Sequence, residues 1–248
     1  MSAYSDHFSD HAGVYARFRP RYPQALFDYL ATHVRCHERA WDCGTGSGQA
    51  ALALTRHFAS VIASDPSTQQ IANAERHARV TYLVAAAERP PLAAASCDLI
   101  TVAQALHWFD TPRFFAAAKS ILRAGGVMAV WCYELMKIKP QIDAVIDHYY
   151  QAVVGPYWPP QRRLVEEGYR SIVFPFEEWP VPSIAMEAEL DLPSVLGYLD
   201  SWSAAQRYRK ARGEEPQDVI RDTLLEAWGD PAQRRLVRWP VCLRIGGN

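Results

Sequence analysis

The chain has 248 residues, of which 49% are hydrophobic, and this is ample for a packed core. An intrinsically disordered protein is therefore excluded. Lys and Arg number 26 against 27 Asp and Glu, which leaves a formal net charge of −1 and no overall positive field. Because such a field holds a nucleic-acid backbone or an anionic bilayer, we expect neither as a partner.

The five cysteines argue against a disulfide framework and against a structural zinc site, because they are widely separated and form no C-x-x-C pair. They are Cys36, Cys43, Cys97, Cys132 and Cys242. We therefore expect free thiols and no metal. The first ten residues are acidic where a signal peptide is basic, and no apolar run reaches the ~18 residues of a membrane span. The expected location is the cytoplasm.

Five short apolar runs mark the first half of the chain, and helix-like segments separate them. Each run shows little internal alternation, as expected for a strand that is buried on both faces. The runs are 40–43, 61–64, 80–86, 99–103 and 127–132, and the helical segments are 49–58, 69–77 and 112–122. Strands that alternate with helices predict an α/β fold built on a parallel sheet with right-handed crossovers.

The pattern changes after residue 132, where helical segments and five of the eight Trp residues gather. Residues 138–170 have the periodicity of amphipathic helices, interrupted by a rigid aromatic turn at 155–160. Residues 176–191 alternate like a strand, 194–212 and 216–228 are predicted helices, and 238–245 form a closing strand. We interpret these segments as insertions that decorate one sheet. The whole of 1–248 then forms a single domain, with the successive parts 1–35, 36–132, 133–235 and 236–248.

A glycine-rich turn, Asp42-Cys-Gly-Thr-Gly-Ser-Gly48, follows the first predicted strand and opens the first helix. Its glycines allow a tight turn and a close approach of a ligand to the main chain. A dinucleotide fingerprint would place a glycine at position 49, where this chain has Gln49, and the Lys-Ser/Thr pair of a P-loop is missing. A nicotinamide-dependent oxidoreductase is therefore the less favoured alternative.

Two acids accompany this turn and narrow the class of ligand. Asp65 ends the second apolar run, a position from which a carboxylate accepts both hydroxyls of a ribose. Asp42 ends the first run, where an acid suits a cationic group such as the ammonium of an amino acid. A nucleoside joined to an amino acid meets both demands, and S-adenosylmethionine is such a molecule.

The stretch from about Tyr15 to Trp131 resembles the class I S-adenosylmethionine-dependent methyltransferases, in the small-molecule branch that contains enzymes similar to trans-aconitate methyltransferase. The resemblance implies a Rossmann-like, mostly parallel sheet of seven strands, with helices on both faces and a helical, aromatic insertion in the second half. It also implies that the first two strand ends hold the methionine part and the ribose of the cofactor. The residues concerned are Asp42, Gly44, Thr45, Gly46, Gly48, Asp65 and Pro66.

Further segments extend the resemblance. Ala87 and Glu88 resemble a turn that packs on the adenine, and Gln104 and Ala105 belong to a segment beneath the methyl group. Many relatives carry an acid just before the Ala-Glu pair to accept from the adenine amino group, but this chain has Ala86 there. That hydrogen bond must come from elsewhere or be lost.

Two further segments, one near each end of the chain, resemble parts that cover the binding site in this family. Residues 1–35 resemble a cofactor lid, in which Tyr15 and Arg19 would meet the methionine carboxylate. Trp202 lies in a segment similar to a late helix near the substrate mouth. His107 and Trp108 follow the fourth strand, at the edge where open α/β sheets bind ligands. We expect Trp108 to form a pocket wall.

The role of His107 depends on the acceptor, for which we expect a small molecule. An ionised carboxylate needs no base, whereas a hydroxyl or an amine does, and His107 is then the candidate catalytic residue. A structural histidine is the alternative. If the acceptor is a polycarboxylate, at least one basic side chain should face the methyl donor, and the candidates are Arg162, Arg163, Arg207 and Arg209.

Two classes of function remain open on the sequence alone. The first is a methyltransferase that acts as a monomer or homodimer, with S-adenosyl-L-homocysteine as its product. The second is a non-catalytic regulatory protein that binds S-adenosylmethionine and has lost turnover. Cofactor binding followed by methylation of an acceptor would separate the two.

Overall fold

The computed structural model describes residues 20–248, so that Tyr15 and Arg19 lie outside the described residues. A sheet with the strand order β3-β2-β1-β4-β5-β8-β6 forms its centre, and β7 pairs with β8 off this path. The strands are β1 (Arg39–Cys43), β2 (Ser60–Asp65), β3 (Val80–Val84), β4 (Cys97–Ala103), β5 (Leu122–Tyr133), β6 (Glu177–Glu178), β7 (Ile184–Leu190) and β8 (Arg235–Gly247). The first five strands are parallel, and the seven strands of the main path confirm the expected Rossmann-like sheet.

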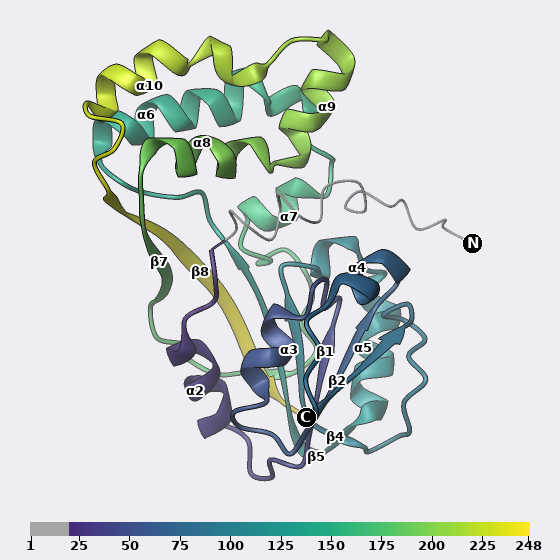
Figure 1. Cartoon of the computed structure of the whole chain (residues 1–248). Helices are drawn as coiled ribbons and strands as arrows, with labels where there is room; N and C mark the ends of the chain where they lie inside the picture. The colour runs from purple at the N-terminus through teal and green to yellow at the C-terminus, as the bar shows by residue number, and fades with distance from the viewer. Residues whose placement is uncertain (1–19) are drawn as a thin grey trace.

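The central strands are apolar throughout because both of their faces are covered. On β5, Val127 and Trp131 point into a cluster with α2 (Gln24–Thr32) and α3 (Gln49–Leu54). The alternate residue Val130 points into a second cluster with α5 (Thr111–Ile121). This two-residue period places helices on both faces of the sheet, as Figure 1 shows.

Helix boundaries differ from the predicted ones where local backbone geometry intervenes. α4 (Thr68–Asn73) begins at the cap Ser67 but ends four residues before the predicted His77, because Ala74 is extended, with ψ of 138°. α3 stops at Leu54 rather than at residue 58. α2 was not among the predicted helices. Its first residue follows Pro23, and its buried residues join the apolar cluster beneath α3.

The second half of the chain forms a helical layer above the carboxyl edge of the sheet (Figure 1). Its elements are α6 (Pro140–His148), η3 (Tyr149–Val153), η4 (Gly155–Tyr157), α8 (Leu192–Asp200), α9 (Ser203–Arg212), η5 (Pro216–Val219) and α10 (Arg221–Trp228). The short helix α7 (Arg162–Glu166) lies between this layer and the sheet (Figure 1). The single helix predicted over 194–212 is two helices, because the backbone of Trp202 is extended between α8 and α9. The layer has an apolar cluster of its own.

β8 joins the helical layer to the sheet, because it has 13 residues where the sequence predicted eight. Its first half pairs with β7, and its second half pairs with β5 and β6, all antiparallel. Figure 1 shows β7 and β8 rising together from the sheet toward α8 and α10. Within residues 20–248, no helix is both long enough and apolar enough to cross a bilayer.

Candidate cofactor and acceptor site

The glycine-rich turn between β1 and α3 has all three glycines in the left-handed region, with φ of 69°, 55° and 88° at Gly44, Gly46 and Gly48. Two of them are required by neighbouring side chains. A Cβ on Gly44 would lie 2.6 Å from Cβ of Ala105, and one on Gly48 would collide with the hydroxyl of Tyr82. A Cβ on Gly46 would lie 3.9 Å from its nearest neighbour in the described residues, Oε1 of Gln70. The main chain is therefore open to a ligand at Gly46.

Asp42 is fully buried at the end of β1. Its carboxylate accepts hydrogen bonds from Oγ1 of Thr45 at 2.5 Å and from Oγ1 of Thr101 at 2.8 Å. Burial raises the pKa of Asp42 to about 6, although these two hydroxyls oppose the rise. No basic side chain within residues 20–248 forms an ion pair with it. Since buried charges require a partner, Asp42 fits a ligand that brings a positive group.

Asp65 ends β2 and fixes the same turn from the other side. Its Oδ2 accepts from the backbone N–H of Gly46 at 2.9 Å, and its Oδ1 accepts from that of Ser67 at 2.9 Å. Pro66 lies between Asp65 and Ser67, just before α4. The two acids predicted from the sequence thus flank one loop. The sequence predicted these two positions for the ammonium group and the ribose of one ligand, and that assignment stays a prediction.

The predicted adenine turn follows β3. Ala87 is buried against the second face of the sheet, whereas Ala86 is exposed and its carbonyl accepts from the N–H of Arg89. Glu88 accepts the backbone N–H of Asp110 at 2.9 Å. The Glu88 carboxylate therefore ties this turn to the N-cap of α5, and its observed contact is structural.

Gln104 follows the last residue of β4 and has φ of 55°, a conformation that is uncommon outside glycine. Its N–H donates to the carbonyl of Trp131, and its Oε1 accepts from the N–H of Tyr133 at 3.0 Å. Both ends of the residue are held by β5. The turn directs the chain over Gly44, where Ala105 packs against the glycine-rich loop.

His107 lies on η2 (Leu106–Trp108), directly after this turn. Its Nδ1 is 3.0 Å from the hydroxyl of Tyr169, and its ring packs at 4.7 Å on Trp108. Burial, with a smaller effect of the Arg162 charge, lowers the pKa of His107 to about 3. The ring is therefore neutral at pH 7. Tyr169 carried no sequence signal for this contact, because it lies 62 positions away and its side chain reaches His107 only through the fold.

Arg162 is the arginine that the fold brings to this region. It starts α7, which packs against η2 and lies between the sheet and the helical layer (Figure 1). Its guanidinium stacks 4.7 Å from the ring centre of Trp158 and 5.3 Å from that of Tyr150, and its Nε donates to the Tyr150 hydroxyl. Within residues 20–248 it has no carboxylate partner.

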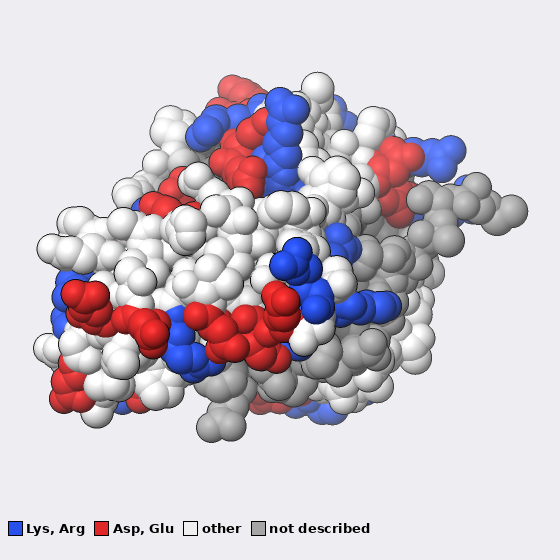
Figure 2. Space-filling model, turned by 90° about the horizontal axis from the view of Figure 1, so that it is seen from above, with Lys and Arg blue, Asp and Glu red and all other residues white. Residues whose placement is uncertain are grey.

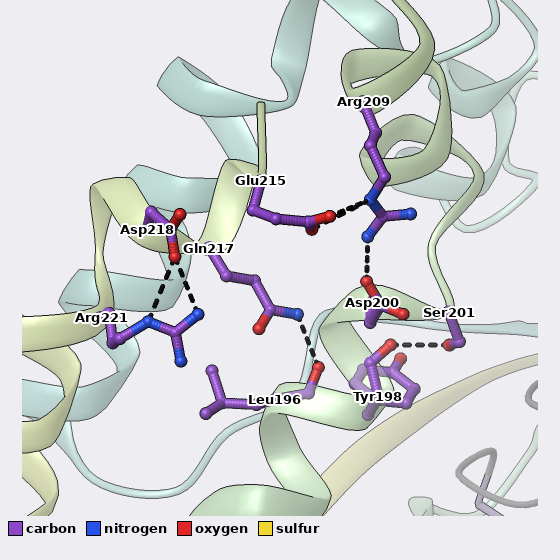
Figure 3. Close-up of polar contacts among 9 residues, drawn as sticks. All are labelled: Leu196, Tyr198, Asp200, Ser201, Arg209, Glu215, Gln217, Asp218 and Arg221. Carbon is purple, nitrogen blue, oxygen red and sulfur yellow. Dashed lines mark hydrogen bonds and ion pairs between the residues drawn. The ribbon is translucent and has the colours of Figure 1, made fainter. Parts of the chain in front are cut away.

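Other arginines predicted as candidates are held elsewhere. Arg163 is 82% exposed and pairs with Glu167 on its own helix. Figure 3 shows Arg209 between Asp200 and Glu215, so that it ties α9 to the end of α8 and to the start of η5. Arg163 thus pairs within its own segment, whereas Arg209 holds parts of the helical layer together.

Trp202 is 3% exposed, in the apolar cluster of the helical layer. Its ring contacts Tyr150 and Trp158, the two rings on which Arg162 stacks, at 5.6 Å in each case. The predicted substrate role of Trp202 can therefore be exerted through those rings, and direct contact with substrate stays a prediction.

Comparison with known proteins agrees with this geometry. The family model of the methyltransferase domain matches residues 41–130, which contain the glycine-rich turn and both acids. A Dictyostelium discoideum protein named as a methyltransferase is 37% identical over 231 residues, covering 91% of this chain and 87% of that protein. A Saccharomyces cerevisiae protein named as an S-adenosylmethionine-dependent methyltransferase is 30% identical over 128 residues, which is 48% of this chain and 44% of that protein.

One solved structure resembles the whole fold, helical layer included. It comes from Anaeromyxobacter dehalogenans, is described as a type II methyltransferase and is 44% identical, with a TM-score of 0.88 over 93% of this chain and 98% of that one. The fold and these matches define a methyltransferase with a Rossmann-like sheet. The chain belongs to the class I S-adenosylmethionine-dependent methyltransferases, and its cofactor is S-adenosylmethionine.

Proposed function

We propose that this methyltransferase acts on a small molecule and methylates one of its carboxylate oxygens. The observation that carries the proposal is Arg162, on a helix that packs against η2, whose guanidinium lies over two aromatic rings and forms no ion pair in the described residues. Guanidinium groups bind carboxylates through two parallel hydrogen bonds. A carboxylate of the acceptor would supply the missing partner.

The residues present fit the cofactor in a definite way. Asp42 would face its positive groups, Asp65 would accept from the ribose, and the open main chain at Gly46 would let it approach closely. When bound, S-adenosylmethionine supplies an activated methyl group. The protein then has to bind and align both partners, which is a task of proximity and orientation.

The proposed reaction balances without a general base. A carboxylate oxygen forms the new bond to the methyl carbon, and the electron pair of the breaking carbon–sulfur bond stays on sulfur. The acceptor becomes a methyl ester, and no proton is released because a carboxylate is already ionised at pH 7. This matches His107, whose lowered pKa makes it a weak base.

The surface supports a small acceptor over a polyanion. Figure 2 views the molecule from above, onto the helical layer, and shows basic and acidic side chains interspersed on this face. We propose a protein that works without nucleic acid or membrane, as a monomer or homodimer in the cytoplasm. The likeness to the trans-aconitate branch stays a prediction.

Calorimetry and kinetics test this function in sequence. Titration of the cofactor-free protein with S-adenosylmethionine comes first, followed by a panel of mono- and polycarboxylic acids, phenols and amines. We expect methyl esters as products, and Arg162→Gln should raise KM for the accepted acid about 10- to 100-fold, in line with loss of a charged hydrogen-bond pair. Arg163→Gln, on the same helix but exposed, is the matched control and should match the wild type. Transfer only to amines or phenols would refute a carboxylate acceptor.

A further inference from the structure

The buried hydroxyl of Tyr169 lies 3.0 Å from Nδ1 of His107, which is its one side-chain partner within residues 20–248. We propose that Tyr169 is a positioning residue that donates its proton to Nδ1 and so fixes His107 in the tautomer with the proton on Nε2. In this tautomer His107 presents a hydrogen-bond donor to an oxygen of the acceptor. The inference rests on the proposed function for the identity of that oxygen.

The direction of the hydrogen bond follows from the number of protons. A phenol has one hydrogen, and leaving it without an acceptor inside a protein costs about 1–3 kcal/mol. If Nδ1 carried the proton instead, the Tyr169 hydroxyl would accept it, and the hydrogen of the phenol would have no acceptor among the described residues. The backbone N–H groups of His107 and Leu106 also favour negative charge on the Tyr169 oxygen. The phenol is therefore the donor.

A doubly protonated His107 ring, which would donate from both nitrogens, is also excluded at pH 7. Burial lowers the pKa of His107 and raises that of Tyr169 well above its ordinary value, so that both are neutral at pH 7. Nε2 of His107 forms no hydrogen bond with another described residue. It is also absent from the polar atoms that are fully buried and unpartnered, so part of its surface is exposed. It can therefore meet a ligand.

The backbone around Tyr169 is built to hold the phenol in place. Tyr169 has φ of 61°, an uncommon and costly conformation for a bulky residue, and follows Gly168 with φ of 59°. Its N–H donates to the carbonyl of Leu164, and its own carbonyl accepts from Nη1 of Arg244 at 2.7 Å. Arg244 is fixed in turn by Glu178. These contacts hold the backbone of Tyr169 in a strained conformation, and that conformation places its phenol ring beside His107.

The chemical consequence concerns the acceptor. Nε2–H donates and cannot take a proton, so the methylated oxygen must arrive without a proton to lose. A carboxylate satisfies this condition, and its second oxygen can bind Arg162 on the neighbouring helix. Thus His107 and Arg162 together select ionised acids over alcohols and amines.

Nitrogen-15 NMR of the imidazole rings in the ligand-free protein tests the tautomer directly. His107→Gln identifies the His107 signals by their disappearance. In the wild type we expect long-range correlations typical of an Nε2–H ring, unchanged between pH 6 and pH 8. Tyr169→Phe should replace this pattern by a mixture of the two tautomers. An Nδ1–H ring in the wild type, or an unchanged tautomer in Tyr169→Phe, would overturn the inference.

Two further measurements separate this role from a merely structural one. Tyr149→Phe removes a buried hydroxyl that has no hydrogen-bond partner within residues 20–248, and it should leave the His107 signals unchanged. With an accepted carboxylic acid, Tyr169→Phe should lower kcat/KM about tenfold, in line with the loss of one hydrogen bond, while the affinity for S-adenosylmethionine stays the same. An unchanged kcat/KM would also contradict the inference. Failure of cofactor binding in the wild type would instead refute the proposed function and leave the NMR result standing.

Discussion

The hydroxyl of Tyr82, on β3, occupies the place that a Cβ on Gly48 would take. A residue of the third strand thus dictates a glycine in the loop after the first strand. The same hydroxyl donates to the carbonyl of Glu75, which holds the ring in position. Gly48 and Gly46 therefore differ. A Cβ on Gly48 would collide with a side chain, whereas a Cβ on Gly46 would not.

This difference predicts unequal effects of two alanine substitutions. Gly46→Ala should lower the free energy of unfolding by about 1–2 kcal/mol, the cost of a left-handed backbone for a residue with a Cβ. Gly48→Ala bears the same cost and should lose a further ~1–3 kcal/mol from the clash with Tyr82. Urea denaturation of both variants checks the ranking. Equal losses would show that Tyr82 moves aside freely.

Asp65 provides the second prediction, on cofactor binding. Asp65→Ala removes the acceptor for the Gly46 N–H and the acceptor that we propose for the ribose hydroxyls. We expect calorimetry to show a loss of about 1–3 kcal/mol in the binding of S-adenosylmethionine. Asp191→Ala, which likewise removes a carboxylate that accepts a backbone N–H but at the start of α8, away from this loop, serves as the control. An unchanged dissociation constant in Asp65→Ala would remove this residue from the cofactor site.

Asp42 predicts a pH dependence of cofactor affinity. Its carboxyl is half protonated near pH 6, and a positively charged ligand favours the carboxylate, so binding must expel the proton at lower pH. The dissociation constant for S-adenosylmethionine should rise about tenfold per pH unit below pH 6 and stay level above it. In Asp42→Asn the affinity should be weak at every pH, without this slope. A wild-type affinity that is constant from pH 5 to pH 8 would show that the carboxylate is not required.

Asp42 and His107 also predict opposite effects of pH on stability. Between pH 6 and pH 4 the folded protein binds more protons at Asp42 than the unfolded chain does, so acidification stabilises it through this group. The pKa of His107 is lowered, so the unfolded chain binds the extra proton below pH 6.5 and acidification destabilises the fold. The two effects oppose each other in the wild type.

Chemical denaturation at several pH values separates these two contributions. On going from pH 6 to pH 4, Asp42→Asn should lose stability more steeply than the wild type, by up to about 1.4 kcal/mol per pH unit. His107→Gln should lose less than the wild type over the same range. Parallel curves for all three proteins would contradict the pKa shifts of both groups.

Local sequence determined the cofactor half of this protein. The apolar runs fixed the parallel strands, and the positions of Asp42 and Asp65 at two strand ends placed them around one loop, because parallel strands end at the same edge of a sheet. Even Gln49, which argued against a dinucleotide fold, has a place in the structure. Its side chain accepts from the N–H of Tyr22 and donates to the carbonyl of Pro20.

Only the tertiary structure decided the acceptor half. Arg162, Arg163, Arg207 and Arg209 were equivalent candidates in the sequence, yet Arg162 stacks beside η2, whereas Arg163 and Arg209 form ion pairs. The partnership of Tyr169 with His107 likewise left no trace in the residue pattern. Strand ends are set by hydrophobic periodicity, which is local. Which side chains meet above them depends on how the helical layer packs on the sheet, and that is settled by contacts between residues far apart in the chain.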